Sequence, residues 1–117
     1  MTTTVWCTTQ IIGFHSWPTA PAAVAFLRDK HRHVFHIRAE VQEDSERGVE
    51  FTLLKQRVEA IISDRYSWMP TGYDFGTRSC ECIAKDIMEG LANACFYVTA
   101  VEVSEDGENG ARVCLIP

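Results

Sequence analysis

Hydrophobic and polar residues alternate along two long stretches near the start of the chain. Residues 3–14 are rich in threonine, valine, tryptophan and isoleucine, which favour strands. Residues 31–42 alternate with a period of two, which places every second side chain on one face of a strand. That face would carry His31, His33, Phe35, Ile37, Ala39 and Val41. We expect two antiparallel strands, with a loop at 16–21 and a short helical turn at 22–27 between them.

The spacing of apolar residues changes after a polar turn at residues 43–48. Apolar side chains recur at helical spacing in residues 52–64 and again in residues 80–92, where Ser79 can cap the second helix. The two stripes consist of Leu54, Val58, Ile61 and Ile62 and of Ile83, Ile87 and Leu91. Residues 65–78 contain a proline and two glycines, which predicts a loop.

Alternation returns near the end of the chain. Residues 96–105 predict a strand, Asp106–Gly110 a hairpin turn, and residues 111–116 a last strand. The predicted order is strand, strand, helix, helix, strand, strand. No repeat or linker divides it, so we expect one domain over residues 1–117.

Composition narrows the possible partners. A net charge of −5 without a basic cluster argues against nucleic-acid binding. No apolar run approaches membrane-spanning length, and the first residues do not read as a signal peptide. The five cysteines have no framework spacing, so reduced thiols in the cytoplasm are the simplest interpretation. Cys80 and Cys82 form only a weak metal-binding pattern, and buried thiols are the plainer alternative.

Two histidines one residue apart are the strongest chemical signal. His31 and His33 would share a strand face, and His15 ends the neighbouring strand. Three imidazoles can hold zinc and leave one coordination position open, as catalytic zinc sites do. The alternative is a set of unconnected, hydrogen-bonded surface histidines. His36 would face the other way from His33, as an ordinary sheet residue.

Five short segments, in this order, resemble the 6-pyruvoyltetrahydropterin synthase family, which includes the 6-carboxytetrahydropterin synthases of queuosine biosynthesis. Each motif alone is weak, but the resemblance that they support covers most of the chain. The segments are Ile-Ile-Gly-Phe-His at 11–15, His-Arg-His at 31–33, Gly-Val-Glu-Phe-Thr-Leu-Leu-Lys at 48–55, Ser-Cys-Glu-Cys-Ile-Ala at 79–84 and Val-Glu-Val-Ser-Glu-Asp at 101–106.

The resemblance implies an α+β tunnelling fold: a four-stranded antiparallel sheet with two helices on one face. It also implies homo-oligomers, trimers or stacked hexamers, with sites at subunit interfaces. By position, zinc would be held by His15, His31 and His33. Glu105 would anchor a pterin or purine-like ligand, with Ser79, Cys80 and Glu81 completing the pocket.

The chain departs from the family pattern at the positions that carry the family's proton-transfer residues. The family cysteine before the paired histidines is replaced at Leu27 or a close neighbour. Of its Asp-His pair, Asp64 is present and Arg65 replaces the histidine, and arginine stays protonated. Arg32 stands where the family has glycine and would add bulk and charge close to the metal. Asp64 and Cys80 are the remaining candidates for catalytic roles.

Three functions stay open at this point. The first is a zinc-dependent lyase acting on 7,8-dihydroneopterin triphosphate or a related dihydropterin. The second is a zinc-containing module that binds a pterin, guanine-like or nucleotide ligand without converting it. The third is a purely structural oligomer. The three histidines argue against the third, and the missing cysteine and histidine argue against the usual version of the first.

Overall fold

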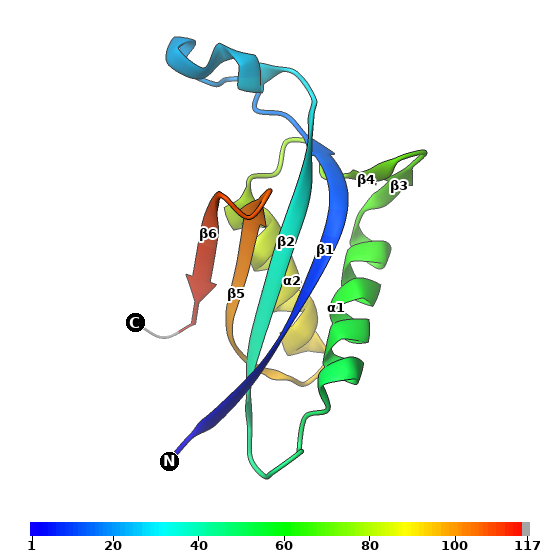
Figure 1. Cartoon of the computed structure of the whole chain (residues 1–117), viewed down its shortest axis with the longest axis vertical. Helices are drawn as coiled ribbons and strands as arrows, with labels where there is room; N and C mark the ends of the chain where they lie inside the picture. The colour runs from blue at the N-terminus through cyan, green and yellow to red at the C-terminus, as the bar shows by residue number, and fades with distance from the viewer. Residues whose placement is uncertain (116–117) are drawn as a thin grey trace.

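Two long strands form the centre of the fold (Figure 1). β1 (Thr3–His15) and β2 (His31–Glu43) pair antiparallel along their full length, with Thr3 opposite Glu43 and His15 opposite His31. The structure is a computed structural model and describes residues 1–115. The predicted alternation is confirmed, because the buried residues of β2 are Phe35, Ile37, Ala39 and Val41.

The C-terminal hairpin extends the sheet beside β2. β5 (Tyr97–Glu105) pairs antiparallel with β2, and β6 (Asn109–Cys114) pairs antiparallel with β5. The turn between them has positive φ at Asp106 (57°) and Gly107 (70°), the backbone that tight hairpin turns require. The predicted hairpin is confirmed, although β6 begins at Asn109 rather than at 111. The predicted end at residue 116 lies outside the described residues.

Within residues 1–115 the sheet has six strands rather than the predicted four, in the order β3-β4-β1-β2-β5-β6. The two extra strands, β3 (Ser67–Met69) and β4 (Gly72–Asp74), lie in the segment predicted as a loop. They form a small hairpin, and β4 pairs parallel with the end of β1. Strands of three residues are too short to show a period of two, which is why the sequence pattern missed them.

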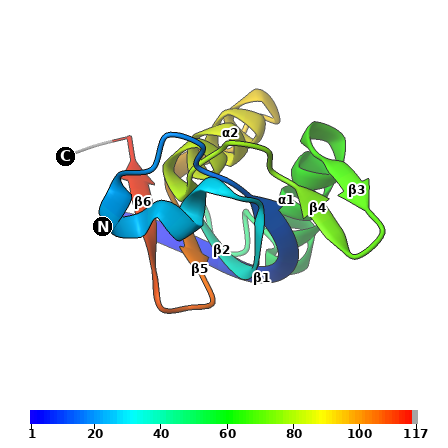
Figure 2. The ribbon, with the colours of Figure 1, turned by 90° about the horizontal axis from the view of Figure 1, so that it is seen from above.

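Two helices cover one face of the sheet, as Figure 2 shows from above. α1 (Phe51–Arg65) is capped by Glu50, whose carboxylate accepts from the Leu53 N–H at 2.7 Å. α2 (Cys80–Asn93) is capped by Ser79, as predicted, through its hydroxyl and the Cys82 N–H at 3.1 Å. The predicted apolar stripes of both helices are buried against the sheet.

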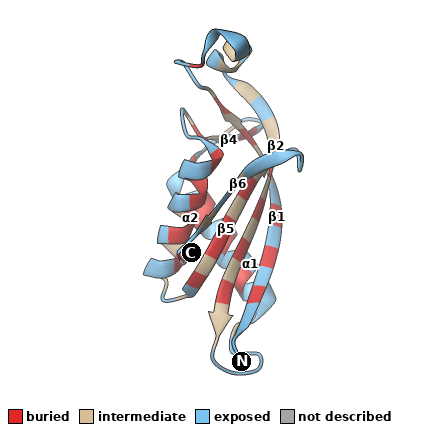
Figure 3. Ribbon diagram, turned by 90° about the vertical axis from the view of Figure 1, so that its left-hand side faces the viewer, coloured by how far each residue is buried: buried red, intermediate tan, exposed pale blue. Residues whose placement is uncertain are grey.

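Burial alternates along the central strands (Figure 3), so the sheet has one covered and one open face. On the open face, the guanidinium of Arg38 lies 4.7 Å from the centre of the Trp6 ring. None of the helices within residues 1–115 is long and apolar enough to span a membrane.

The connection between β1 and β2 projects beyond the end of the sheet (Figure 1). It contains a 3-10 helix at Ala22–Arg28, which has no buried residue and confirms the predicted helical turn. Arg28 Nε donates to the Ala20 carbonyl at 2.8 Å, and the Trp17 N–H donates to the Leu27 carbonyl at 2.8 Å. These bonds bring Trp17 and Leu27 back beside the end of β1.

Candidate metal centre and ligand pocket

Four side chains meet where β1 ends, β2 begins and β5 ends. They are His15, His31, His33 and Glu105, and one potential ligand atom from each lies within 4.8 Å of the others. The register explains the meeting, because His15 pairs with His31, and Glu105 pairs with Phe35, which is two residues from His33. Three strands thus present these groups on the helix-covered face, and the cluster could hold a metal ion.

An oxygen acceptor holds the Nδ1 atom of each histidine. His15 Nδ1 lies 2.9 Å from the Arg78 carbonyl, His31 Nδ1 lies 2.9 Å from the Asp29 carbonyl, and His33 Nδ1 lies 2.7 Å from Asp106 Oδ2. Carbonyl and ionised carboxylate oxygens only accept hydrogen bonds, so each Nδ1 must carry a proton. In neutral imidazoles this leaves the three Nε2 lone pairs free for one ion.

Asp106 is well suited to hold the Nδ1 proton of His33. Its Oδ1 accepts from the Val34 N–H at 2.9 Å, while Oδ2 faces His33. The Val34 N–H, followed by His33, lowers the pKa of the Asp106 carboxyl, so it is ionised near neutral pH. A carboxylate behind a metal-binding imidazole fixes the ring and raises its basicity.

On the Nε2 side of the cluster, His15 is within hydrogen-bond distance of Glu105, whereas His33 lacks a satisfactory partner. Glu105 Oε2 lies 3.2 Å from His15 Nε2 and 2.6 Å from His33 Nε2. His33 Nε2 is nevertheless buried without a hydrogen bond of acceptable geometry. A buried nitrogen lone pair that faces a carboxylate is the arrangement expected where a cation belongs, so the residues fit a divalent metal. Imidazole and carboxylate ligands suit zinc and other first-row transition metals.

An aromatic layer lies beneath the histidines. The Phe35 ring is 0% exposed, and its centre lies 5.2 Å from that of His15 and 5.7 Å from that of His33. Phe75 packs against Phe35 at 4.8 Å and over Gly13, where a Cβ atom would come close to the Phe75 ring. This packing places a fully buried aromatic ring directly against two of the three imidazoles.

A pocket of about 540 Å³ opens beside His15 and His31. A volume of this size is within the ordinary range for small-molecule sites. Its walls are the loop after β1, the segment before α2 and the start of β6, and they include Trp17, Leu27, Thr77, Arg78, Ser79, Cys80, Glu81, Cys82, Glu105 and Asn109. The predicted ligand-binding residues Ser79, Cys80, Glu81 and Glu105 all line this pocket.

Cys80 lies on the pocket wall as the first residue of α2. Burial, followed by the charges of Glu105 and Glu81, raises the pKa of its thiol to about 12. Near neutral pH the thiol is therefore protonated, and it can donate a proton but is a poor base or nucleophile. Leu27, which with its close neighbours was expected in place of the cysteine of the resembled family, also lines the pocket and brings only an apolar side chain.

Asp64 is not brought to this cluster. It is exposed near the end of α1 and lines a separate hollow with Arg57, Asn93 and Ala94. The expectation that Arg32 adds charge close to the metal is also wrong. Arg32 is exposed, pairs with Phe14 and points to the face opposite His31 and His33, because neighbouring side chains in a strand alternate.

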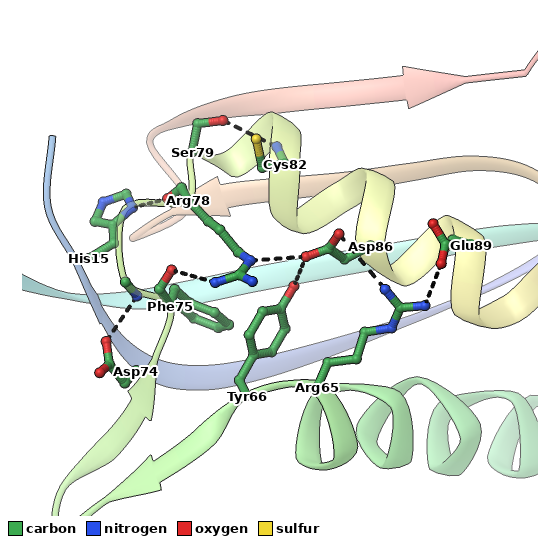
Figure 4. Close-up of polar contacts among 11 residues, drawn as sticks. His15, Arg65, Tyr66, Asp74, Phe75, Arg78, Ser79, Cys82, Asp86 and Glu89 are labelled. Carbon is green, nitrogen blue, oxygen red and sulfur yellow. Dashed lines mark hydrogen bonds and ion pairs between the residues drawn. The ribbon is translucent and has the colours of Figure 1, made fainter.

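A network centred on Asp86 supports the segment before α2 (Figure 4). Asp86 Oδ2 accepts from the Tyr66 hydroxyl at 2.7 Å and lies 3.2 Å from Arg78 Nε. Arg65 joins from α1, with Nη1 at 3.8 Å from Asp86 and Nη2 at 3.0 Å from Glu89. The network fixes Arg78, whose carbonyl holds His15, so Arg65 has a structural partner away from the pocket.

Sequence reasoning missed Asp106, Arg78 and Trp17 as parts of the site. The sequence places Asp106 in the hairpin turn and at the end of the 101–106 motif, and its position directly after Glu105 is a usable signal. Trp17 follows His15 by two residues and could have been placed near it on that ground. No sequence signal pointed to Arg78, because its contribution to the histidines is a backbone carbonyl.

No family model matches the chain, and no curated protein matches it. Solved structures do match it along almost its whole length. An uncharacterized protein from Wolinella succinogenes has a TM-score of 0.69 at 14% identity, covering 98% of this chain and 99% of that one. The 6-pyruvoyl tetrahydropterin synthase of Caenorhabditis elegans has a TM-score of 0.68 at 12% identity, covering 97% and 96%.

The chain has an α+β tunnelling fold. The fold class predicted from the sequence is confirmed, with β3 and β4 added to the four predicted strands. At these identities the likeness concerns the fold alone.

Replacement of Asp106 tests whether it supports the metal site. Asp106→Asn removes the charge that faces His33 Nδ1, so we expect metal affinity to fall by roughly 10- to 100-fold, as for other residues behind a metal ligand. Competition with a chromophoric chelator measures the affinity. Glu108→Gln is the control, because Glu108 is exposed in the same turn and loses the same charge. Equal affinities in the two variants would contradict the assignment.

The thiol of Cys80 can be titrated directly. Thiolate absorbs near 240 nm, and the difference between wild type and Cys80→Ser isolates this residue from the other cysteines. With its pKa raised to about 12, Cys80 should show no thiolate between pH 6 and pH 9 in metal-free protein. A midpoint near neutral pH would show that Cys80 is activated and would restore it as a candidate nucleophile.

Proposed function

We propose that this chain is a zinc-dependent protein of the pterin-synthase type, acting on 7,8-dihydroneopterin triphosphate or a related dihydropterin. The observation that carries the proposal is the orientation of His15, His31 and His33, whose Nδ1 atoms are held by oxygen acceptors beside a pocket. The likeness in fold to a protein named 6-pyruvoyl tetrahydropterin synthase supports the choice of ligand class.

His15, His31 and His33 would hold the zinc through Nε2. When bound, zinc supplies a Lewis acid that polarises a ligand oxygen. The carboxylates of Glu105 and Glu81 lie in the same pocket and can accept hydrogen bonds from the N–H groups of an amino-pyrimidinone ring. Ser79 and Cys80 lie at the N-terminal end of α2, where free backbone N–H groups favour polar or anionic groups of a ligand.

The two candidate functions, enzyme and binding module, differ in whether the pocket contains a group that can transfer protons. Leu27 and the protonated thiol of Cys80 give the pocket no base at those positions. Asp64 would serve only if an assembly places its helix end at the pocket of another subunit. The proposed cytoplasmic homo-oligomer, a trimer or hexamer, would allow this. Without such an assembly, Glu81 and Glu105 are the carboxylates of the pocket. The second candidate function is a module that binds the ligand without converting it.

Zinc content tests the metal part of the proposal. Wild-type protein should hold about one zinc per chain, as expected for a three-histidine site. His31→Ala should lose it. His36→Ala is the matched control, because His36 is on the same strand and faces the opposite side. Equal zinc content in both variants, or none in wild type, would contradict the metal assignment.

The ligand is tested by incubation with 7,8-dihydroneopterin triphosphate and mass spectrometry of everything bound and released. A product of changed mass supports the enzyme. Unchanged ligand recovered from the denatured protein supports the binding module. A zinc-loaded protein that neither binds nor converts this compound or 7,8-dihydroneopterin would contradict the pterin class while leaving the metal site intact.

A further inference from the structure

The carboxylate of Glu105 lies inside the histidine cluster rather than free in the pocket. Its side chain is only 24% exposed, and Oε2 contacts the Nε2 atoms of both His15 and His33 at 3.2 and 2.6 Å. The strand pairing explains this position. Val101, Val103 and Glu105 of β5 lie on the same face of the sheet as Phe35 and His33 of β2.

These contacts need a cation. His15 Nδ1 already donates to the Arg78 carbonyl, and His33 Nδ1 donates to Asp106. In neutral rings, two Nε2 lone pairs therefore point at a carboxylate lone pair, and three acceptors repel one another. Either protons on the rings or one metal ion would turn this repulsion into attraction, and the two cases can be separated by measurement.

The distances suit a shared metal. In a tetrahedral zinc site with bonds of about 2.0–2.1 Å, neighbouring ligand atoms lie about 3.3–3.4 Å apart. The 3.2 Å between Glu105 Oε2 and His15 Nε2 is close to that value, whereas the 2.6 Å to His33 Nε2 is shorter. A bound zinc ion would therefore require a slightly longer separation between Glu105 and His33. Glu81, the other acidic residue of the pocket, does not belong to the cluster.

We propose that Glu105 is a fourth ligand of the metal in the ligand-free protein and leaves the metal when it anchors a ligand. This inference rests on the proposed function. Two adjacent N–H groups of an amino-pyrimidinone require both carboxylate oxygens. Arrival of that ring at Glu105 therefore opens a coordination position at the metal, and the site stays closed to other small molecules until the ring is recognised.

Cobalt substitution tests the proposal without an activity assay, because the visible absorption of Co²⁺ reports its ligands. Glu105→Gln should lower cobalt affinity at least roughly tenfold, since loss of a direct ligand exceeds the loss of a supporting residue. It should also change the visible spectrum. Glu102→Gln is the matched control, on the same strand but on the opposite face. It should match wild type in both respects.

Addition of 7,8-dihydroneopterin to the wild-type cobalt protein tests the exchange. The spectrum should move towards that of ligand-free Glu105→Gln, while the spectrum of the variant should change little. Glu105→Asp, which keeps the charge but shortens the side chain, serves if the glutamine variant does not fold.

If Glu105→Gln binds cobalt with the affinity and the visible spectrum of wild type, the inference is overturned and the three-histidine site still stands. Bound 7,8-dihydroneopterin that leaves the wild-type spectrum unchanged would overturn the exchange. Wild-type protein that binds neither cobalt nor zinc would instead overturn the proposed function itself.

Discussion

The candidate site depends on three hydrogen bonds that act on the far side of the imidazoles. The Arg78 carbonyl, the Asp29 carbonyl and the Asp106 carboxylate each hold one Nδ1 proton and thereby direct one Nε2 lone pair. The three acceptors come from three different loops, before α2, before β2 and after β5. The strands bring the histidines together, but the loops decide which nitrogen of each ring is available. The Asp86 network matters for the same reason, because it fixes the segment that carries Arg78.

This arrangement separates metal binding from proton transfer. The residues that could hold a metal, the aromatic layer under them and the acidic wall of the pocket are all present in one chain. The groups that would move protons are missing or displaced: Leu27 is apolar, Cys80 keeps its proton, and Asp64 lies at a separate hollow. A carboxylate that can bind either the metal or the ligand fits such a site. In the proposed exchange, recognition of the ligand would control access to the metal without the acid–base groups that the sequence lacks.

Much of the fold could be predicted from the sequence because burial on one face leaves a regular pattern. The period of two in β2 placed His31 and His33 on one face, and the helical spacing in residues 52–64 and 80–92 gave both helices. The β3-β4 hairpin was missed because three-residue strands have no measurable period. The direction of Arg32 follows from the same alternation that placed the histidines, and it was overlooked. The contact of Asp106 with His33 leaves only a weak signal, the position of Asp106 directly after Glu105. The role of the Arg78 carbonyl leaves none, since it is a backbone contact between residues far apart in the chain.

Crystals of the zinc-loaded protein, measured on both sides of the zinc absorption edge, test the central claim most directly. The account predicts one anomalous peak among the Nε2 atoms of His15, His31 and His33, with Glu105 Oε2 in its coordination sphere and every Nδ1 still bound to its oxygen acceptor. A peak elsewhere, or histidines that turn Nδ1 towards the ion, would contradict it.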